Sequence, residues 1–304
     1  MSVFLRKRLR LGIISLASAA AVVALVAAAC GDNQEGSAGG PSAEKKLSAV
    51  ATLEIFADMA RQVGGERVEV SALLPPGADA HTYELPPNRV ADIAEADVAL
   101  MNGLGLEAST EDVIEENAGG LVVELAEGLP VIDDNPHLWL DARLAARYVE
   151  RIRDAFVDLD PADRAEYEAN ASAYLDELGD LDHEFEGAIQ SIPPENRKLV
   201  TFHDAFPYLA ERYGLEVVAV VVTSPGQEPS AADVAELTER LSAEDVPAVF
   251  REPQLNARIL EQAADEAGVQ VLELLSDSFN KDVASYVDLM RFNMEQLVRG
   301  LGGE

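Results

Sequence analysis

Residues 161–192 read PADRAEYEANASAYLDELGDLDHEFEGAIQSI, the most regular helical pattern in the chain. Asp160 and Pro161 supply a capping residue and a proline at the first helical position, and the pair Pro193-Pro194 stops the helix. Apolar residues recur between them at steps of three and four, from Tyr167 to Ile192. At about 1.5 Å per residue such a helix is about 46 Å long, which exceeds the width of one small domain. The pattern therefore predicts a helix that joins two lobes and resists bending between them.

The sequence on either side of this helix shares a pattern at an offset of 150 residues. The segments IFADMARQVGG (55–65) and AFPYLAERYGL (205–215) are both amphipathic, both carry a glycine at the end, and both follow a short apolar run. Further apolar runs then alternate with helical patterns in each half, which predicts βαβ units and a parallel sheet flanked by helices. We therefore expect an α/β protein with an N-terminal lobe over 47–160, a linking helix over 161–192 and a C-terminal lobe over 193–304.

The composition is that of a strongly acidic globular protein. The 304 residues are 48% hydrophobic and 26% charged, and 55 acidic residues against 23 basic ones give a formal net charge of −32. So acidic a surface is repelled by phosphate backbones and by anionic lipid headgroups. The charge argues against nucleic-acid binding and leaves small molecules, cations or a partner protein as ligands.

Residues 1–29 have the pattern of a secretory signal. The basic start RKRLR is followed by an apolar run from Leu11 to Ala29 and then by Cys30. The layout resembles a bacterial lipoprotein signal, in which cleavage leaves Cys30 first and its thiol is acylated. Because the 19 apolar residues nearly reach the roughly 20 that span a bilayer, an uncleaved anchor is the alternative. Residues 30–46 predict a flexible tether, and both interpretations place the remaining chain outside the cytoplasm.

Three of the four histidines fall in the loops that follow predicted strands. His81 follows a strand of the first half, His137 lies in NPHLWLD just before a helix, and His203 ends the strand KLVTF. Asp277 follows the last strand of the second half, whereas His183 lies inside the linking helix and is expected to be a surface residue. Parallel α/β sheets bind ligands beyond the carboxyl ends of their strands. Because imidazoles and a carboxylate gathered in a buried cleft are costly without a cation, the first three histidines and the aspartate predict one metal site shared by both halves.

Four strings carry a resemblance to a known family: HTYEL at 81–85, NPHLWLD at 135–141, TFHDAFPYLAERYGL at 201–215 and SDSF at 276–279. They are similar to the metal-binding lipoproteins of bacterial ABC importers for zinc and manganese, from about Leu47 to Leu301. The resemblance implies two α/β lobes joined by a long rigid helix, with a single metal between them. The residues at the family's ligand positions are His81, His137, His203 and Asp277.

The resemblance also implies a role and partners. The chain is expected to be an extracytoplasmic monomer, anchored to the outer face of the membrane through lipidated Cys30, that delivers one metal ion to a permease driven by a cytoplasmic ATPase. Imidazole suits zinc and carboxylate suits manganese, and in this family a glutamate at the position of His203 tends to accompany manganese carriers. Three histidines and one aspartate favour Zn²⁺, with Mn²⁺ as the alternative.

Several residues near the predicted ligands carry secondary expectations. Glu84 and Asp204 adjoin ligands and are candidates to fix a histidine tautomer, with surface salt bridges or caps as the alternative. Glu252 follows a strand of the second half and is expected to form a hydrogen bond across the lobes, with a role as a metal ligand as the alternative. Trp139, the only tryptophan, is expected to pack beside the site. Residues 107–134 contain nine acidic residues and no histidine, which predicts a solvated acidic face.

Two functions from other classes remain as alternatives. A metal-dependent hydrolase can use three histidines and an aspartate, but four protein ligands fill a tetrahedron and leave no position for the attacking water. The sequence also has no separate motif for a nucleophile or a general base. A surface adhesin is compatible with acidic lobes but leaves the metal cluster without a purpose. We therefore expect that the chain is not an enzyme.

Overall fold

The computed structural model describes residues 46–223, 225–227 and 229–303. The predicted signal, Cys30 and residues 30–45 of the predicted tether lie outside the described residues. Among the described helices, none combines the length and the apolar character needed to cross a bilayer.

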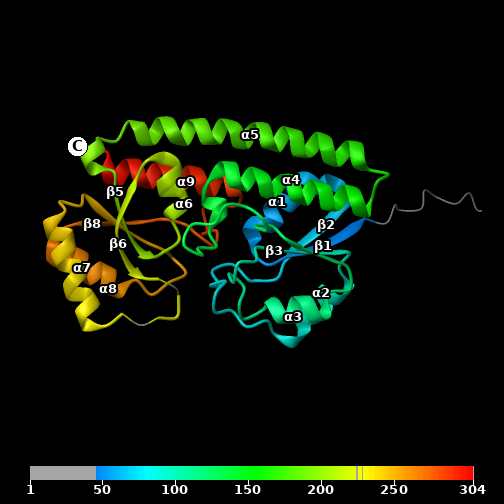
Figure 1. Cartoon of the computed structure of the whole chain (residues 1–304), viewed down its shortest axis with the longest axis horizontal. Coiled ribbons are helices and arrows are strands. Elements are labelled where there is room, and N and C mark those ends of the chain that lie inside the picture. Colours follow the sequence, from blue (N-terminus) through cyan, green and yellow to red (C-terminus); the bar gives the residue numbers. More distant parts are fainter. Residues whose placement is uncertain (1–45, 224, 228, 304) are drawn as a thin grey trace, which may run out of the picture. The chain divides into compact units, whose positions relative to one another are not determined.

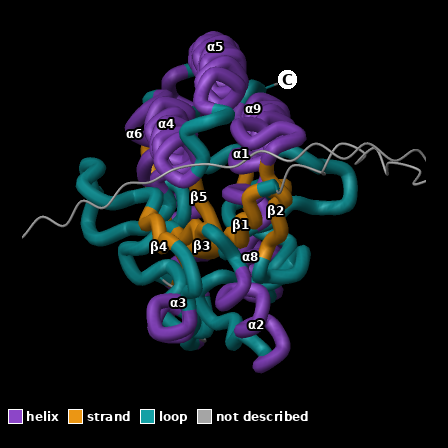
Figure 2. Tube along the Cα trace, turned by 90° about the vertical axis from the view of Figure 1, so that its right-hand side faces the viewer, coloured by secondary structure: helices purple, strands orange, loops and turns teal. Residues whose placement is uncertain are grey.

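The first half forms a parallel sheet with helices on both faces. Its strands lie in the order β2-β1-β3-β4, and Ala49 at the centre of β1 pairs with both Val70 and Val98. The middle strand β3 is buried along its whole length, as expected when both faces of a parallel sheet are covered. Figure 2 shows α1 and α4 on one face and α2 and α3 on the other. The bounds are β1 Leu47–Ala51, α1 Glu54–Gly64, β2 Val68–Ala72, α2 Pro87–Glu95, β3 Val98–Met101, α3 Glu111–Asn117, β4 Leu121–Glu124 and α4 Ala142–Leu159.

The second half repeats this arrangement. Its parallel strands lie in the order β6-β5-β7-β8, which is the order of the first sheet moved on by four strands. The shared order agrees with the offset of 150 residues between the two halves, and the α/β class with one parallel sheet in each lobe is confirmed. The bounds are β5 Lys198–His203, α6 Pro207–Tyr213, β6 Glu216–Val222, α7 Ala231–Ala243, β7 Ala248–Arg251, α8 Arg258–Ala267, β8 Gln270–Glu273 and α9 Tyr286–Leu301.

The long helix between the lobes is α5, Arg164–Gln190. Its 27 residues correspond to about 40 Å, and it packs against α1 and α4 of the first lobe and against α6 and α9 of the second (Figure 1). The prediction that Asp160 caps this helix was wrong. Asp160 ends α4 instead, with its backbone N–H donating to Phe156, and its carboxylate accepts from the Tyr167 hydroxyl at 3.1 Å. A single tight turn therefore reverses the chain between α4 and α5.

The main hydrophobic core is continuous between the lobes. It runs from the first sheet through α1, α4 and α5 to α9 and the inner face of the second sheet, and its largest members include Trp139, Tyr148, Phe185 and Tyr286. A second, smaller core lies between the outer face of the second sheet and helices α7 and α8. Because the first core belongs to both lobes, the loops that face each other between them are held on a common support.

Candidate metal centre

Four side chains from the two lobes meet at one point. The ligand atoms of His81, His137, His203 and Asp277 all lie within 4.8 Å of one another. The His137 Nε2 atom is 3.3 Å from His81 Nε2 and 3.5 Å from Asp277 Oδ1. A tetrahedral ion with bonds of about 2.1 Å sets its ligand atoms about 3.4 Å apart, so this spacing suits a single four-coordinate metal.

The carboxyl ends of the strands supply these side chains. His203 is the last residue of β5 and pairs with Val222 of β6, and Asp277 lies in the loop after β8. His81 follows β2 in a turn where Asp79 accepts its backbone N–H at 3.0 Å. His137 immediately precedes the short 3₁₀ helix Leu138–Leu140. Each lobe therefore contributes two of the four groups, as the strand-end rule predicts.

Three buried atoms of this cluster lack a hydrogen-bond partner among the described residues. They are His203 Nε2 and both carboxylate oxygens of Asp277, in residues that are respectively 0% and 2% exposed. A buried polar atom without a partner costs about 1–3 kcal/mol, and a carboxylate costs more. All three atoms belong to the one cluster, so the residues present fit a cation that would bind them together.

Glu252 fixes the orientation of His203. One carboxylate oxygen lies 2.7 Å from His203 Nδ1 and the other accepts the His203 backbone N–H at 3.2 Å. Because a carboxylate only accepts, Nδ1 carries the proton and Nε2 faces the cluster. Ser276 also donates to Glu252, at 2.8 Å. The prediction that Glu252 bonds across the lobes was wrong. Its partners His203 and Ser276 both lie in the second lobe, because β5, β7 and β8 belong to one sheet.

Asn135 plays the corresponding part for His137. Its side-chain oxygen accepts from the His137 backbone N–H at 3.1 Å and lies 2.9 Å from His137 Nδ1. The backbone N–H fixes the identity of that oxygen, so Nδ1 must donate to it and Nε2 faces the cluster. The sequence analysis did not assign this role. The available signal is that an asparagine two residues before a histidine can accept from its backbone.

Burial and neighbouring charges shift the pKa of every group in the cluster. Burial alone would lower the pKa of His203, but the charge of Glu252 and its hydrogen bond outweigh it and raise the pKa to about 9. Burial raises the pKa of Asp277 to about 7. Burial, together with the charge of His203, lowers the pKa of His81 to about 4 and that of His137 well below its ordinary value.

The other residues that the sequence analysis singled out lie as follows. Glu84 is exposed and has no hydrogen bond to the three histidines in the described part of the chain. Asp204 accepts from the Asn135 side chain through its backbone carbonyl, at 2.5 Å. Trp139 is fully buried, with its ring centroid 5.2 Å from that of His137, and His183 is exposed on α5.

The expectation of a solvated acidic face over residues 107–134 was wrong for its first member. Glu107 is fully buried, and its carboxylate accepts from Thr52 at 2.7 Å and from the backbone of Asn102 at 2.8 Å. Burial raises its pKa to about 7. The remainder of the segment is not one loop, because it contains α3 and β4. Glu107 ties the end of β3 to the end of β1.

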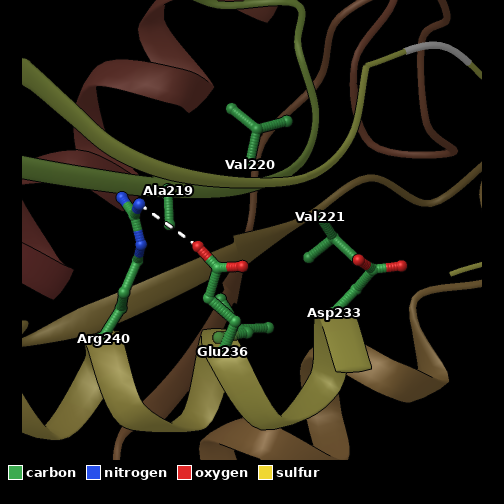
Figure 3. Close-up of a pocket in the computed structure, with 7 residues that line it drawn as sticks. Ala219, Val220, Val221, Asp233, Glu236 and Arg240 are labelled. Carbon is green, nitrogen blue, oxygen red and sulfur yellow. Dashed lines mark ion pairs between the residues drawn. The ribbon is translucent and has the colours of Figure 1, made fainter. Parts of the chain in front are cut away.

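A groove in the second lobe shares no residue with this cluster. It lies between β6 and α7, has a volume of about 210 Å³, and is lined by Val220 and Val221 on the strand and by Asp233, Glu236 and Arg240 on the helix (Figure 3). Arg240 pairs with Glu236 at 3.2 Å and also donates to the Val218 carbonyl at 2.9 Å. The Arg240 guanidinium therefore links α7 to the edge strand β6. Among the described residues, this groove holds no cluster of metal ligands.

Residues 49–300 match the family described as zinc-uptake complex component A, periplasmic. The manganese-binding lipoprotein MntA of Halalkalibacterium halodurans is 31% identical, over 92% of this chain and 96% of its own length. The iron-binding protein YfeA of Yersinia pestis is 31% identical, over 85% of this chain and 87% of its own length.

Among solved structures, the periplasmic zinc-binding protein TroA from Treponema pallidum superposes with a TM-score of 0.81. The two chains are 30% identical, and the match covers 85% of this chain and 100% of that one. The family match over residues 49–300 includes α5 and all four members of the cluster. The family match extends over more than four-fifths of the sequence, so this chain belongs to the family of periplasmic component A proteins of zinc-uptake complexes.

Proposed function

We propose that the chain captures one divalent transition metal between its lobes, outside the cytoplasm, and delivers it to an ABC importer. The observation that carries the proposal is the convergence of His203 Nε2 and both Asp277 oxygens, buried and without partners, on the two other histidines. Membership of the family supports the transport role. We propose His81, His137, His203 and Asp277 as the ligands.

Zinc is the metal that we propose. Three imidazole nitrogens and one carboxylate are a typical zinc set, and manganese lies at the weak end of the affinity order for divalent metals. The charges also favour a dication, because Asp277 and Glu252 together balance a charge of +2 inside the site. Manganese is the alternative, since the relatives named above are described as binding manganese, iron or zinc at similar identity.

The proposal extends to the membrane and to partners. Residues 1–29 would direct export, and acylation of Cys30 would hold the receptor beside a permease with a cytoplasmic ATPase. The relative MntA is itself described as a lipoprotein. If Cys30 is the anchor, Cys30→Ser should yield an unprocessed precursor or release the protein to the medium. Unchanged mass and unchanged membrane retention would favour the uncleaved segment instead.

We propose binding and not catalysis. Four protein ligands complete a tetrahedron around zinc, which leaves no coordination position for a reacting water. A hydrolase would need one of the four to leave the metal, and two of them, His137 and His203, are held by Asn135 and Glu252.

The test is metal analysis of the purified chain from Gly31 onward, followed by competition between zinc and manganese. We expect one zinc per chain and displacement of manganese by equimolar zinc. Trp139 provides the signal for titrations, because it is the only tryptophan and lies against His137. A wild-type protein that holds manganese against equimolar zinc would rule out zinc as the metal.

Substitutions identify the ligands. His81→Ala, His137→Ala and His203→Ala should each weaken zinc binding by at least about 100-fold, because each removes one of four bonds to the metal. His183→Ala is the matched control, since that histidine is exposed on α5 and its Nδ1 donates to the Gly179 carbonyl at 2.7 Å, away from the cluster. Wild-type affinity in any of the first three variants would remove that histidine from the site.

A further inference from the structure

The side chain of Asn135 contacts both lobes at once. Its oxygen accepts from His137 of the first lobe, and its nitrogen donates to the backbone carbonyl of Asp204 in the second lobe at 2.5 Å. Asp204 directly follows His203. One amide group therefore connects the loop that carries one predicted ligand to the loop that carries another.

The orientation of this amide follows from its neighbours. The His137 backbone N–H can only donate, so the atom that faces it is oxygen, and the Asp204 carbonyl can only accept, so the atom that faces it is nitrogen. Asn135 is 8% exposed, and its bond to His137 is buried whereas its bond to Asp204 is partly buried. A carboxylate in the same place can replace the first bond but not the second.

Other hydrogen bonds between described residues also cross between the lobes, but none of them is made to the ring of a proposed ligand. The Tyr208 hydroxyl donates to the Asn135 backbone carbonyl at 2.6 Å, the Trp139 indole donates to the Ser276 carbonyl at 2.9 Å, and the Gly77 N–H donates to the Ser278 hydroxyl at 2.8 Å. These bonds hold the facing loops together. Asn135 differs from them because the same amide also orients the imidazole of His137.

We propose that Asn135 is a positioning residue that couples the orientation of His137 to the closure of the lobes and so sets the rate of metal release. The inference rests on the proposed function and deepens it. When the bond to Asp204 opens, the amide that holds His137 is free to move, and the imidazole loses its fixed direction toward the metal. Capture and release then depend on one link between the lobes rather than on the ligands alone.

The test is the substitution Asn135→Asp in the chain from Gly31 onward, with zinc as the probe. The new carboxylate still accepts from His137 but cannot donate to the Asp204 carbonyl. Zinc release, measured by transfer to an excess of a chromogenic chelator, should become about 10-fold faster or more, while the rate of zinc uptake changes by less than about 3-fold.

Asn293→Asp is the matched control. Asn293 is also a buried asparagine that both accepts and donates, but both of its bonds, each 2.8 Å, go to the Leu275 backbone within the second lobe. We expect Asn293→Asp to lower the melting temperature of the metal-free protein and to leave zinc release within about 2-fold of wild type. Equal acceleration in both variants, or none in Asn135→Asp, would overturn the inference.

A second variant keeps the test decisive if either substitution prevents folding. Tyr208→Phe removes a hydroxyl by which α6 of the second lobe contacts the loop of Asn135, and it leaves the amide in place. It should accelerate release less than Asn135→Asp does, and acceleration by the same factor would mean that loop contact in general, not the Asn135 amide, sets the rate. If wild-type protein binds no metal at all, the proposed function fails, which is a result distinct from failure of the coupling.

Discussion

The protonation state of single residues should control whether the proposed site accepts a metal. The pKa of His203 is raised to about 9 and that of Asp277 to about 7, whereas that of His81 is lowered to about 4. At neutral pH the metal-free His203 therefore carries a proton on the nitrogen that faces the cluster. A metal can bind His203 only after this proton has left. The proton on His203 is therefore the strongest competitor of the metal.

The affinity for zinc should therefore depend on pH up to about 9, whereas ordinary histidines would make it depend on pH only near 6.5. A raised pKa means that the proton is present below it and absent above it, so affinity rises with pH. We expect about tenfold per pH unit between pH 7 and 9 from His203, and a steeper slope below pH 7 as Asp277 also becomes protonated. Competition titrations from pH 6 to 9 check this, and an affinity that stays flat over that range would contradict it.

Glu252→Gln separates orientation from charge. Glutamine keeps one oxygen for His203 Nδ1 but removes the negative charge that raises the pKa of His203. We expect the dependence of affinity on pH between 7 and 9 to disappear, and the affinity at pH 9 to fall about 10–100-fold because the charge no longer helps to balance the metal. Glu107→Gln is the control, since Glu107 is equally buried but bonds to no ligand. Its pH profile should match that of wild type.

At the scale of elements, the Asp182 carboxylate of α5 binds an arginine from one helix of each lobe. Asp182 accepts two hydrogen bonds from Arg212 of α6, at 2.8 and 2.5 Å, and one from Arg143 of α4 at 3.1 Å. Burial alone would raise the pKa of Asp182, but the bonds from the two arginines outweigh it and lower the pKa. The long helix is thus fixed to both lobes by a polar link as well as by its apolar face.

The two arginines should contribute unequally to stability. The Arg212 side chain is 11% exposed and that of Arg143 is 64% exposed. Breaking a buried pair typically costs about 3 kcal/mol, whereas a solvated pair is worth less than about 1 kcal/mol. Urea unfolding of Arg212→Gln and Arg143→Gln should show this difference in the free energy of unfolding. If both variants lost the same free energy of unfolding, the exposure of each arginine would not determine how much its bond to Asp182 stabilises the protein.

The sequence predicts the elements and the grouping of the four side chains better than it predicts the hydrogen bonds between the lobes. His81, His137, His203 and Asp277 could be grouped because they follow the strands of the two parallel sheets, whose carboxyl ends are where such sheets bind ligands. The role of Asn135 could not, since its partners Asp204 and Tyr208 lie 69 and 73 residues away in the other lobe. Asp160 was assigned to the wrong helix because an aspartate before a proline suits a helix start, whereas only the fold shows that α4 ends there.

At the scale of the whole described chain, the shared core limits how far the lobes can separate. Helix α9 of the second lobe begins against α1 of the first, where the Asp58 carboxylate accepts the Tyr286 N–H at 2.8 Å. The Tyr286 hydroxyl donates to the Trp139 carbonyl at 2.7 Å. Because these groups are buried in the main core, the lobes should unfold together in one cooperative transition.

A metal held between the lobes should stabilise that whole cooperative unit. Its four proposed ligands come from both lobes and are scattered in the unfolded chain, so zinc at 100 times its dissociation constant adds about 2.7 kcal/mol to the free energy of unfolding. At about 2–4 °C per kcal/mol for a chain of this size, the melting temperature should rise by about 5–11 °C and should return when a chelator is added. His81→Ala should abolish the rise, because it removes one of the four proposed ligands. If zinc raised the melting temperature of His81→Ala as much as that of wild type, the stabilising ion would have to bind elsewhere.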